Sequence, residues 1–402
     1  MVTEEVIRHV YDESARRIRE VDCAYHRSLY SQVDWSTRTV AINGPKGVGK
    51  TTLLLQYLKE HPTVAEKALY VSLDDIWVDA VDLLELARHH EQHGGTHLFL
   101  DEVHYLRNWP RLIKNIYDSF KSLKIAYTGS SILQIKSGSG DLSRRQIEYA
   151  LDGLSFREYL MLEGVGEFPA VRIEEILSNH VELAEGISRK VRVLPHFERY
   201  LRLGYYPFYR EDENHYSRKL IQVVNQVLER DLPMVEDISM ETVRKSRKML
   251  SILADSTPQT PNITRLSRDL GIDRKQGVKL LHLLRRAGLL GLLAEDADAL
   301  KYLGSPSKIY CENPNLMYAL SACPDKGTLR ESFFNNQVGE VCELTYPKCG
   351  DFLIEGKYLV EVGGANKGFD QIKDIPNSFL AVDGTEIGRG SRIPLWLFGF
   401  LY

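Results

Sequence analysis

Short apolar runs alternate with amphipathic stretches in the N-terminal part of the chain. Four of the runs have the length and composition of buried parallel strands, and the stretches between them carry apolar residues at helical spacing. The predicted strands cover residues 39–42, 68–73, 97–100 and 125–128. Strands that alternate with helices in this way predict an α/β fold with a parallel sheet.

The sequence GPKGVGKTT joins the first predicted strand to an amphipathic helix. Gly44, Gly49, Lys50 and Thr51 have the spacing of a P-loop, whose backbone N–H groups surround phosphates while the lysine and the hydroxyl contact the phosphates and Mg²⁺. The pattern predicts a site for ATP and Mg²⁺. The predicted nucleotide-binding residues are Gly44, Pro45, Lys46, Gly47, Val48, Gly49, Lys50, Thr51 and Thr52.

The third predicted strand ends in two carboxylates, Asp101 and Glu102. A strand of this kind delivers both groups to the carboxyl edge of the sheet. We expect Asp101 to hold Mg²⁺ with Thr51, directly or through water, and Glu102 to polarise the water that attacks the γ-phosphate. The alternative is an ordinary strand followed by a solvated acidic turn, and the P-loop upstream makes it the weaker interpretation.

The fourth predicted strand runs into a hydroxyl-rich turn, residues 128–131. The Ser130 hydroxyl is predicted to bond the γ-phosphate or the lytic water, and the alternative is a turn that caps a helix from Ile132. Arg144 and Arg145 come after a polar loop over residues 137–140, and one of them is expected to stabilise the charge that develops during hydrolysis. The sequence leaves open which arginine acts, and on which subunit's nucleotide.

Composition limits the class of partner and the compartment. The 402 residues include 51 basic and 55 acidic side chains, and a formal net charge of -4 gives no global field that attracts nucleic acid or an anionic membrane. The five scattered cysteines fit reduced thiols, and the sequence shows neither a signal-peptide pattern nor an apolar stretch of ~18 residues. We therefore expect a cytoplasmic protein with no membrane partner.

Five motifs, taken in order, carry a family resemblance. GPKGVGKTT, LFLDEVHYLRNWPRLIKNIYD, YTGSS, DLSRR and LSFREYL resemble the bacterial and archaeal AAA-type ATPases that carry a C-terminal PD-(D/E)XK nuclease-like domain. The similarity extends to IPLWLFGFLY at the C-terminus. It implies an ATPase in which Lys50 and Thr51 bind phosphate and Mg²⁺, and in which Asp101 and Glu102 form the Walker B element.

The same resemblance assigns roles to further residues. It places sensor 1 at residues 128–131 and the family's arginine at Arg145, whereas Arg144 stands where a glycine is common. His104 and Trp109 also match, and we expect them to position Walker B or to pack the core.

Helical periodicity dominates residues 155–240, and Ser155 with Glu158 has the spacing of a capping box. We expect these helices to form a lid behind the nucleotide, with the aromatic cluster at residues 200–209 packing its core rather than stacking on bases.

Three short helices are predicted next, over residues 247–254, 263–270 and 273–287, and a hairpin follows them. This arrangement resembles a winged helix, whose third helix enters a DNA major groove. The alternative is a protein-contact module, because Glu295, Asp296 and Asp298 in the wing would repel phosphate. The basic residues of the third helix are Arg274, Lys275, Lys279, Arg285 and Arg286.

The C-terminal part resembles a PD-(D/E)XK nuclease, in which an Asp and a Glu bind a divalent ion and a Lys two residues later assists the water. Asp351 and Glu361 fit the two carboxylates, but Gly363 occupies the lysine position. Lys367, or Lys373 on a helix predicted over residues 367–375, can reach back into the site. Glu331 or Glu340 can complete the carboxylate set. Without a lysine in place, we expect a nuclease-like domain that does not cleave DNA.

The expected fold is an α/β, AAA-type P-loop core with a helical lid, a winged-helix-like domain and a small α+β restriction-endonuclease-like domain. We expect an ATPase that acts with DNA or a protein partner, with a homo-oligomer as a further candidate assembly. An ATP-regulated DNA nuclease that uses Asp351, Glu361 and Lys367 is one alternative, and a nucleotide-dependent signalling switch with little turnover is another. The expected parts are residues 1–36 (N-terminal helical segment), 37–165 (ATPase core), 166–242 (lid), 243–325 (winged-helix-like) and 326–402 (degenerate nuclease-like).

Overall fold

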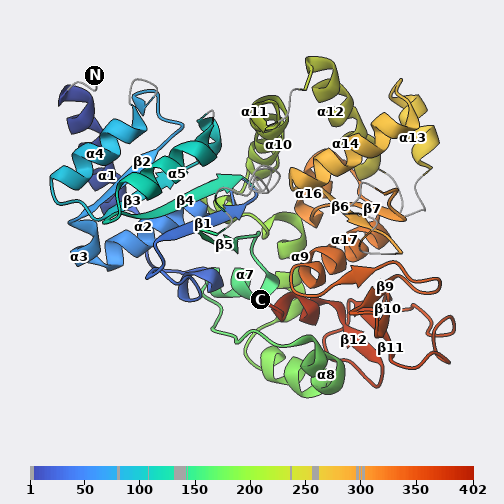
Figure 1. Cartoon of the computed structure of the whole chain (residues 1–402). Coiled ribbons are helices and arrows are strands. Elements are labelled where there is room, and N and C mark those ends of the chain that lie inside the picture. Colours follow the sequence, from blue (N-terminus) through green and yellow to red (C-terminus); the bar gives the residue numbers. More distant parts are fainter. Residues whose placement is uncertain are drawn as a thin grey trace. The chain divides into compact units, whose positions relative to one another are not determined.

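The chain folds into two compact units (Figure 1). In this computed structural model, unit 1 comprises Met1–Asp152 and Glu229–Ile238, and unit 2 comprises Gly153–Leu228 and Ser239–Tyr402. The segment Glu229–Ile238 therefore packs with unit 1 although the chain on both sides of it belongs to unit 2. The structure describes residues 4–78, 82–106, 108–130, 142, 144–235, 238–255, 262–295, 298, 300 and 304–402.

A five-stranded parallel sheet forms the centre of unit 1, in the order β2-β3-β4-β1-β5. The first four strands confirm the strands expected from the apolar runs, and their residues are almost all buried. The edge strand β5 has mostly exposed residues, so no apolar run announced it. The strands are β1 (Thr39–Gly44), β2 (Ala68–Ser72), β3 (His97–Asp101), β4 (Lys124–Ser130) and β5 (Ile147–Ala150).

Helices of unit 1 pack against this sheet: α1 on β2, and α2 on β1 and β4. Because β1 and β3 both run parallel to β4, the P-loop after β1 and the Walker B residues at the end of β3 lie at the same edge of the sheet. The helices are α1 (Glu4–Glu20), η1 (Ser28–Ser31), α2 (Lys50–Glu60), α3 (Pro62–Ala65), α4 (Leu83–Gln92), η3 (Val103–Tyr105), α5 (Trp109–Ser119) and α11 (Leu232–Val235).

The helices expected to form a lid belong to unit 2. Helix α8 packs on β12 (Arg392–Pro394) and η7 (Leu395–Phe400), and α9 packs on α16 (Pro314–Leu320). Ser155 makes the predicted capping box with Glu158, and the aromatic cluster, which includes Tyr200 and Tyr205, is buried as expected for core packing. The elements are α7 (Phe156–Leu162), α8 (Ile173–Ser188), α9 (Val193–Leu203), η5 (Pro207–Glu211), α10 (Tyr216–Gln226) and η6 (Val227–Asp231), a π-helical turn that enters unit 1.

Three helices and an antiparallel strand pair follow, as the sequence predicts. Their apolar faces are buried, whereas Arg274, Lys275 and Lys279 of α14 are exposed. The elements are α12 (Met240–Ala254), α13 (Ile263–Asp269), α14 (Arg274–Arg286), β6 (Leu290–Leu293) and β7 (Lys308–Cys311).

The C-terminal part of unit 2 is a mixed sheet, in the order β12-β11-β10-β9-β8, against which α17 packs. The helix expected over residues 367–375 is wrong, because turns occupy this stretch and its backbone bonds join residues three apart, as from Ile375 N–H to the Ile372 carbonyl. Pro376 follows and disfavours a helical residue before it. The elements are α16 (Pro314–Leu320), α17 (Lys326–Gly339), β8 (Leu344–Thr345), β9 (Phe352–Ile354), β10 (Tyr358–Gly364), β11 (Ser378–Asp383), β12 (Arg392–Pro394) and η7 (Leu395–Phe400).

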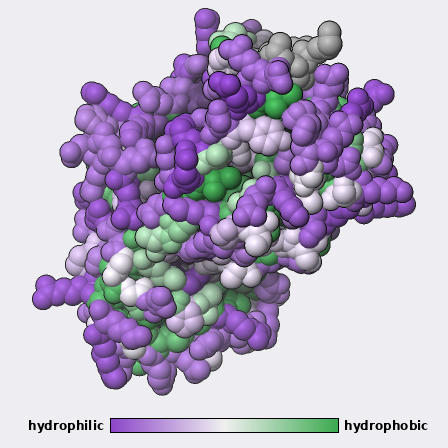
Figure 2. All heavy atoms as spheres, turned by 90° about the vertical axis from the view of Figure 1, so that its left-hand side faces the viewer, coloured by the Kyte–Doolittle hydropathy of each residue, from purple (hydrophilic) through white to green (hydrophobic). Residues whose placement is uncertain are grey.

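The surface carries both hydrophilic and apolar side chains. Hydrophilic side chains cover much of the face drawn in Figure 2, with apolar side chains showing between them. In the described part of the chain, no helix has the length and apolarity that a bilayer crossing needs. All five cysteines are free.

Candidate functional site

The P-loop connects β1 to α2 and is shaped by its glycines. Gly49 caps α2 with a φ of 102°, a left-handed conformation that side chains disfavour. Gly44 lies against the Leu151 carbonyl, and a Cβ at this position would lie 2.0 Å from that oxygen. Lys50 is buried, and its Nζ donates to the carbonyls of Gly44 at 3.0 Å and Pro45 at 2.9 Å. The loop therefore holds in place the lysine that a phosphate would need.

Walker B meets the P-loop at Asp101. The Thr51 hydroxyl donates to Asp101 Oδ2 at 2.7 Å, and the Tyr70 hydroxyl donates to the same oxygen at 2.7 Å. The Thr128 hydroxyl donates to Oδ1. Burial raises the pKa of Asp101, the nearby Glu102 raises it further, and the three hydroxyls only partly offset this. The site thus contains a buried carboxylate whose charge no cation neutralises among the described residues.

Glu102 is held in an uncommon backbone conformation beside Asp101. Its φ is 55°, which costs a non-glycine residue on the order of 1 kcal/mol or more. Its N–H donates to the Thr128 hydroxyl at 2.9 Å, and its Oε2 lies 3.2 Å from His104 Nδ1. Thr128 therefore contacts both Walker B residues, and His104 lies against Glu102, so its role in positioning Walker B stays a prediction.

A second buried carboxylate, Asp231, reaches the site from the segment Glu229–Ile238. Its Oδ1 lies 3.7 Å from His104 Nε2, and its Oδ2 lies 3.9 Å from Lys46 Nζ. Lys46 also donates to the Tyr105 hydroxyl at 3.3 Å. Sequence reasoning missed Asp231, because it lies within a helical pattern far along the chain and carries no motif.

Arg27 braces the P-loop from the N-terminal segment. Its guanidinium donates to the Val48 carbonyl at 2.7 Å and to the Asp152 carbonyl at 2.8 Å. No motif marks this arginine, and a single sequence contains no signal that could have found it.

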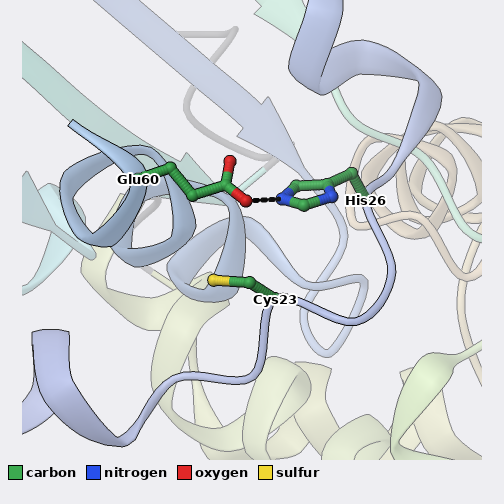
Figure 3. A group of neighbouring side chains, drawn as sticks. All are labelled: Cys23, His26 and Glu60. Atoms are coloured by element: carbon green, nitrogen blue, oxygen red, sulfur yellow. Dashed lines mark ion pairs between the residues drawn. The ribbon is translucent and has the colours of Figure 1, made fainter.

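Cys23 and His26, which lie near Arg27 in sequence, form a small cluster with Glu60 at the end of α2 (Figure 3). Their ligand atoms lie within 4.8 Å of one another, and these are residue types that bind Zn²⁺. However, His26 Nε2 already pairs with Glu60 Oε1 at 3.1 Å, Tyr30 donates to Oε2, and burial raises the pKa of the Cys23 thiol. These contacts account for the cluster as an anchor between the Arg27 segment and the end of α2.

The remaining predicted site residues of unit 1 are spread around the sheet. Ser130 ends β4, is buried, and has Gly44 as its strand partner. Arg144 is exposed, and Arg145 pairs with Asp118 at 3.3 Å, so their catalytic roles stay predictions. Trp109 is buried in the core, and Ser131 and the loop 137–140 lie outside the described residues.

Unit 2 contains the carboxylates predicted for a nuclease-like site. Lys308 of β7 lies between two of them, with its Nζ 2.8 Å from Glu331 Oε2 and 3.0 Å from Asp351 Oδ1. Burial lowers the pKa of Lys308, but the attraction of Asp351 and Glu331 outweighs it and raises the pKa overall. Tyr310 also donates to Glu331, at 2.8 Å. An internal ammonium therefore offsets part of the charge of this carboxylate pair.

Lys367 reaches back to Glu361, as the sequence analysis anticipated. Its Nζ lies 2.7 Å from Glu361 Oε1. Its stem crosses Gly363, where a Cβ would lie 2.5 Å from Lys367 Cγ. Lys367 thus fills the space that a side chain at position 363 would take.

The parallel sheet, the P-loop and Walker B define an AAA-type P-loop domain, and the comparisons agree. Residues 36–160 match the family model described as an AAA domain, and residues 194–326 match a domain of unknown function, DUF8612. The chain is 30% identical over 391 residues to the uncharacterized protein MJ1637 of Methanocaldococcus jannaschii, and the alignment covers 88% of this chain and 81% of that protein. The chain belongs to the same family as that protein.

Further matches are more distant. A second uncharacterized M. jannaschii protein, MJ1544, is 22% identical over 304 residues, covering 72% of this chain and 64% of that protein. Among solved structures, the Orc1 protein of Aeropyrum pernix in complex with DNA has a TM-score of 0.32 at 11% identity, covering 79% of this chain and 92% of that one. A TM-score this low supports no conclusion about this chain.

Proposed function

We propose that unit 1 binds ATP with Mg²⁺ and hydrolyses it. The observation that carries the proposal is the 2.7 Å contact between the Thr51 hydroxyl and Asp101, which joins the P-loop to Walker B. Hydroxyl and carboxylate oxygens are the ligands that Mg²⁺ prefers, so Thr51 and Asp101 fit this ion. When bound, Mg²⁺ supplies positive charge that offsets charge on the phosphate oxygens.

The protein residues then have separate tasks. Lys50 and the loop amides bind phosphate oxygens. Glu102 orients the attacking water, and the Thr128 hydroxyl holds its backbone in place. Tyr70 keeps Asp101 oriented by its hydrogen bond.

ATP turnover by the wild type and two variants tests this proposal. Lys50→Ala should lose tight ATP binding, whereas Glu102→Gln should bind ATP but turn over at least about 100-fold more slowly, because it keeps the phosphate contacts and loses the water-orienting charge. Lys121→Ala and Glu66→Gln, at exposed positions of unit 1, serve as matched controls. Equal turnover by the wild type and Glu102→Gln would remove Glu102 from the mechanism.

A DNA partner is the finer part of the proposal. The exposed basic side chains Arg274, Lys275 and Lys279 on α14 support it, since phosphate contacts come from lysine and arginine. Turnover with and without duplex and single-stranded DNA, at two salt concentrations, tests it. Stimulation that fades with salt is the expected result, and equal turnover in every condition would contradict it.

Metal-dependent DNA cleavage by unit 2 is a second candidate, favoured by the placement of Lys367 against Glu361. Lys308 opposes it, because its ammonium already lies between Glu331 and Asp351. Plasmid cleavage with Mn²⁺ that is lost in Asp351→Ala and kept in Lys50→Ala would establish this activity.

A further inference from the structure

The segment Glu229–Ile238 belongs to unit 1 although it is distant from the rest of that unit in sequence, and within it Asp231 and Leu232 are buried. It begins in the π-helical turn η6, a rare geometry that often occurs at functional sites. It continues as α11, which packs on η3, the turn that carries His104. Leu232 is fully buried and anchors the segment. The segment is therefore built into the neighbourhood of Walker B.

Asp231 is the polar group that this segment delivers, and it is 1% exposed. Neither of its carboxylate oxygens makes a hydrogen bond among the described residues. A buried carboxylate without hydrogen bonds is costly unless nearby cations offset it. The cationic or titratable groups that face it are Lys46 of the P-loop and His104. Both distances exceed those of a good hydrogen bond, so a small shift is needed to close them.

His104 connects Asp231 to the residue expected to orient water. Its side chain is 1% exposed, with Nε2 toward Asp231 and Nδ1 toward Glu102 Oε2. Neither ring nitrogen makes a hydrogen bond among the described residues, so the imidazole connects the two carboxylates by proximity and charge, and a change at Asp231 reaches Glu102 through this one buried side chain.

We propose that Asp231 is a positioning residue for ATP hydrolysis, acting on Glu102 through His104. This inference rests on the proposed ATPase function. Its consequence is that unit 1 completes its site with a segment that the chain of unit 2 flanks on both sides in sequence.

The test uses the full chain and compares Asp231→Asn, His104→Gln and the double variant. Asp231→Asn keeps the shape and removes the charge, and we expect kcat to fall about tenfold or more while ATP affinity changes less than about threefold. The double variant should be no slower than the slower single variant by more than about twofold, because the two residues act in series. Asp212→Asn, which breaks an exposed pair with His215 in unit 2, is the matched control and should be unchanged.

Each outcome decides between the two claims. An unchanged kcat in Asp231→Asn, with an active wild type, overturns this inference and leaves the ATPase proposal standing. Two further results also overturn this inference. In the first, the fold-losses in kcat of the two single variants multiply in the double variant. In the second, ATP affinity and kcat fall together, as a general structural defect predicts. A wild type that does not hydrolyse ATP under any condition overturns the ATPase proposal and this inference with it.

Discussion

Each unit gathers buried carboxylates beside a parallel strand, but the two units neutralise them differently. In unit 1, three hydroxyls from Thr51, Tyr70 and Thr128 bond Asp101, and its pKa stays raised by burial and by Glu102. In unit 2, the ammonium groups of Lys308 and Lys367 already pair with the carboxylates. Hydroxyls satisfy hydrogen bonds without supplying charge, so Asp101 has no cationic partner among the described residues, whereas each of the three unit 2 carboxylates already contacts an ammonium group.

Asp101→Asn should have the largest effect on the unit 1 site. We expect ATP hydrolysis to fall at least about 100-fold, because the variant removes the charged oxygen ligand.

The same variant should also be more stable than the wild type at neutral pH without nucleotide. A carboxyl whose pKa is raised by folding loses stability as the pH rises from its ordinary value of 3.8 through the folded value, and Asn resembles the protonated form. Melting temperatures of the two proteins, measured in EDTA at pH 4 and pH 7.5, should therefore differ more at pH 7.5. If the melting temperature of the variant, minus that of the wild type, were lower at pH 7.5 than at pH 4, the result would contradict this account.

Lys308→Met tests the unit 2 side. Removing one member of a buried ion pair costs about 3–5 kcal/mol, so the free energy of unfolding should fall by that order. We expect Mn²⁺ to raise the melting temperature of this variant but not that of the wild type, because the freed Glu331 and Asp351 can then bind a cation. Lys373→Met, at an exposed surface pair with Asp370, is the control. A Lys308→Met variant as stable as wild type, or one indifferent to Mn²⁺, would show that the lysine does not replace a metal.

Arg27→Ala tests whether the shape of the P-loop depends on a residue outside the loop. The removal of two charge-assisted hydrogen bonds to backbone carbonyls should weaken ATP binding about tenfold, since such bonds contribute about 1.5–3 kcal/mol. Fluorescence titration with a labelled ATP analogue measures this, with the exposed Arg19→Ala as control. Equal affinities would mean that the loop holds its shape without the arginine.

The smallest expected effect concerns the basic surface of α14. The paired change Lys275→Ala with Lys279→Ala should weaken DNA binding a few-fold, and it should lower the salt slope by about one for each phosphate that the lysines no longer neutralise. Lys326→Ala, an exposed lysine of α17, is the control. An unchanged slope would assign the α14 surface to a protein contact instead.

The local motifs of the candidate site could be predicted from the sequence because the residues of each motif are close together along the chain. The P-loop and Walker B each lie within a short stretch at a strand end, so pattern and spacing were sufficient. Tyr70 could not be identified in this way, because it reads as one more apolar position in a buried strand. Asp231 and Lys308 could not be predicted either. Each reaches its partners only in the folded chain: Asp231 lies near His104, and Lys308 lies between Glu331 and Asp351.

The fold divides in the same way. Apolar runs predict the buried strands, whereas the exposed edge strand β5 has no such run. Helical periodicity located α7, α8, α9 and α10, but an amphipathic pattern shows only which face is apolar, not what it packs against. The role of these helices as a lid therefore stays a prediction, while their packing within unit 2 is a finding of the structure.

Calorimetric titration of the folded protein with ATP, with and without Mg²⁺, tests the central claim most directly. We expect Mg²⁺-dependent ATP binding by the wild type and by Glu102→Gln, and no tight binding by Lys50→Ala. Failure of the wild type to bind any purine nucleotide in the presence of Mg²⁺ would contradict the assignment of this site.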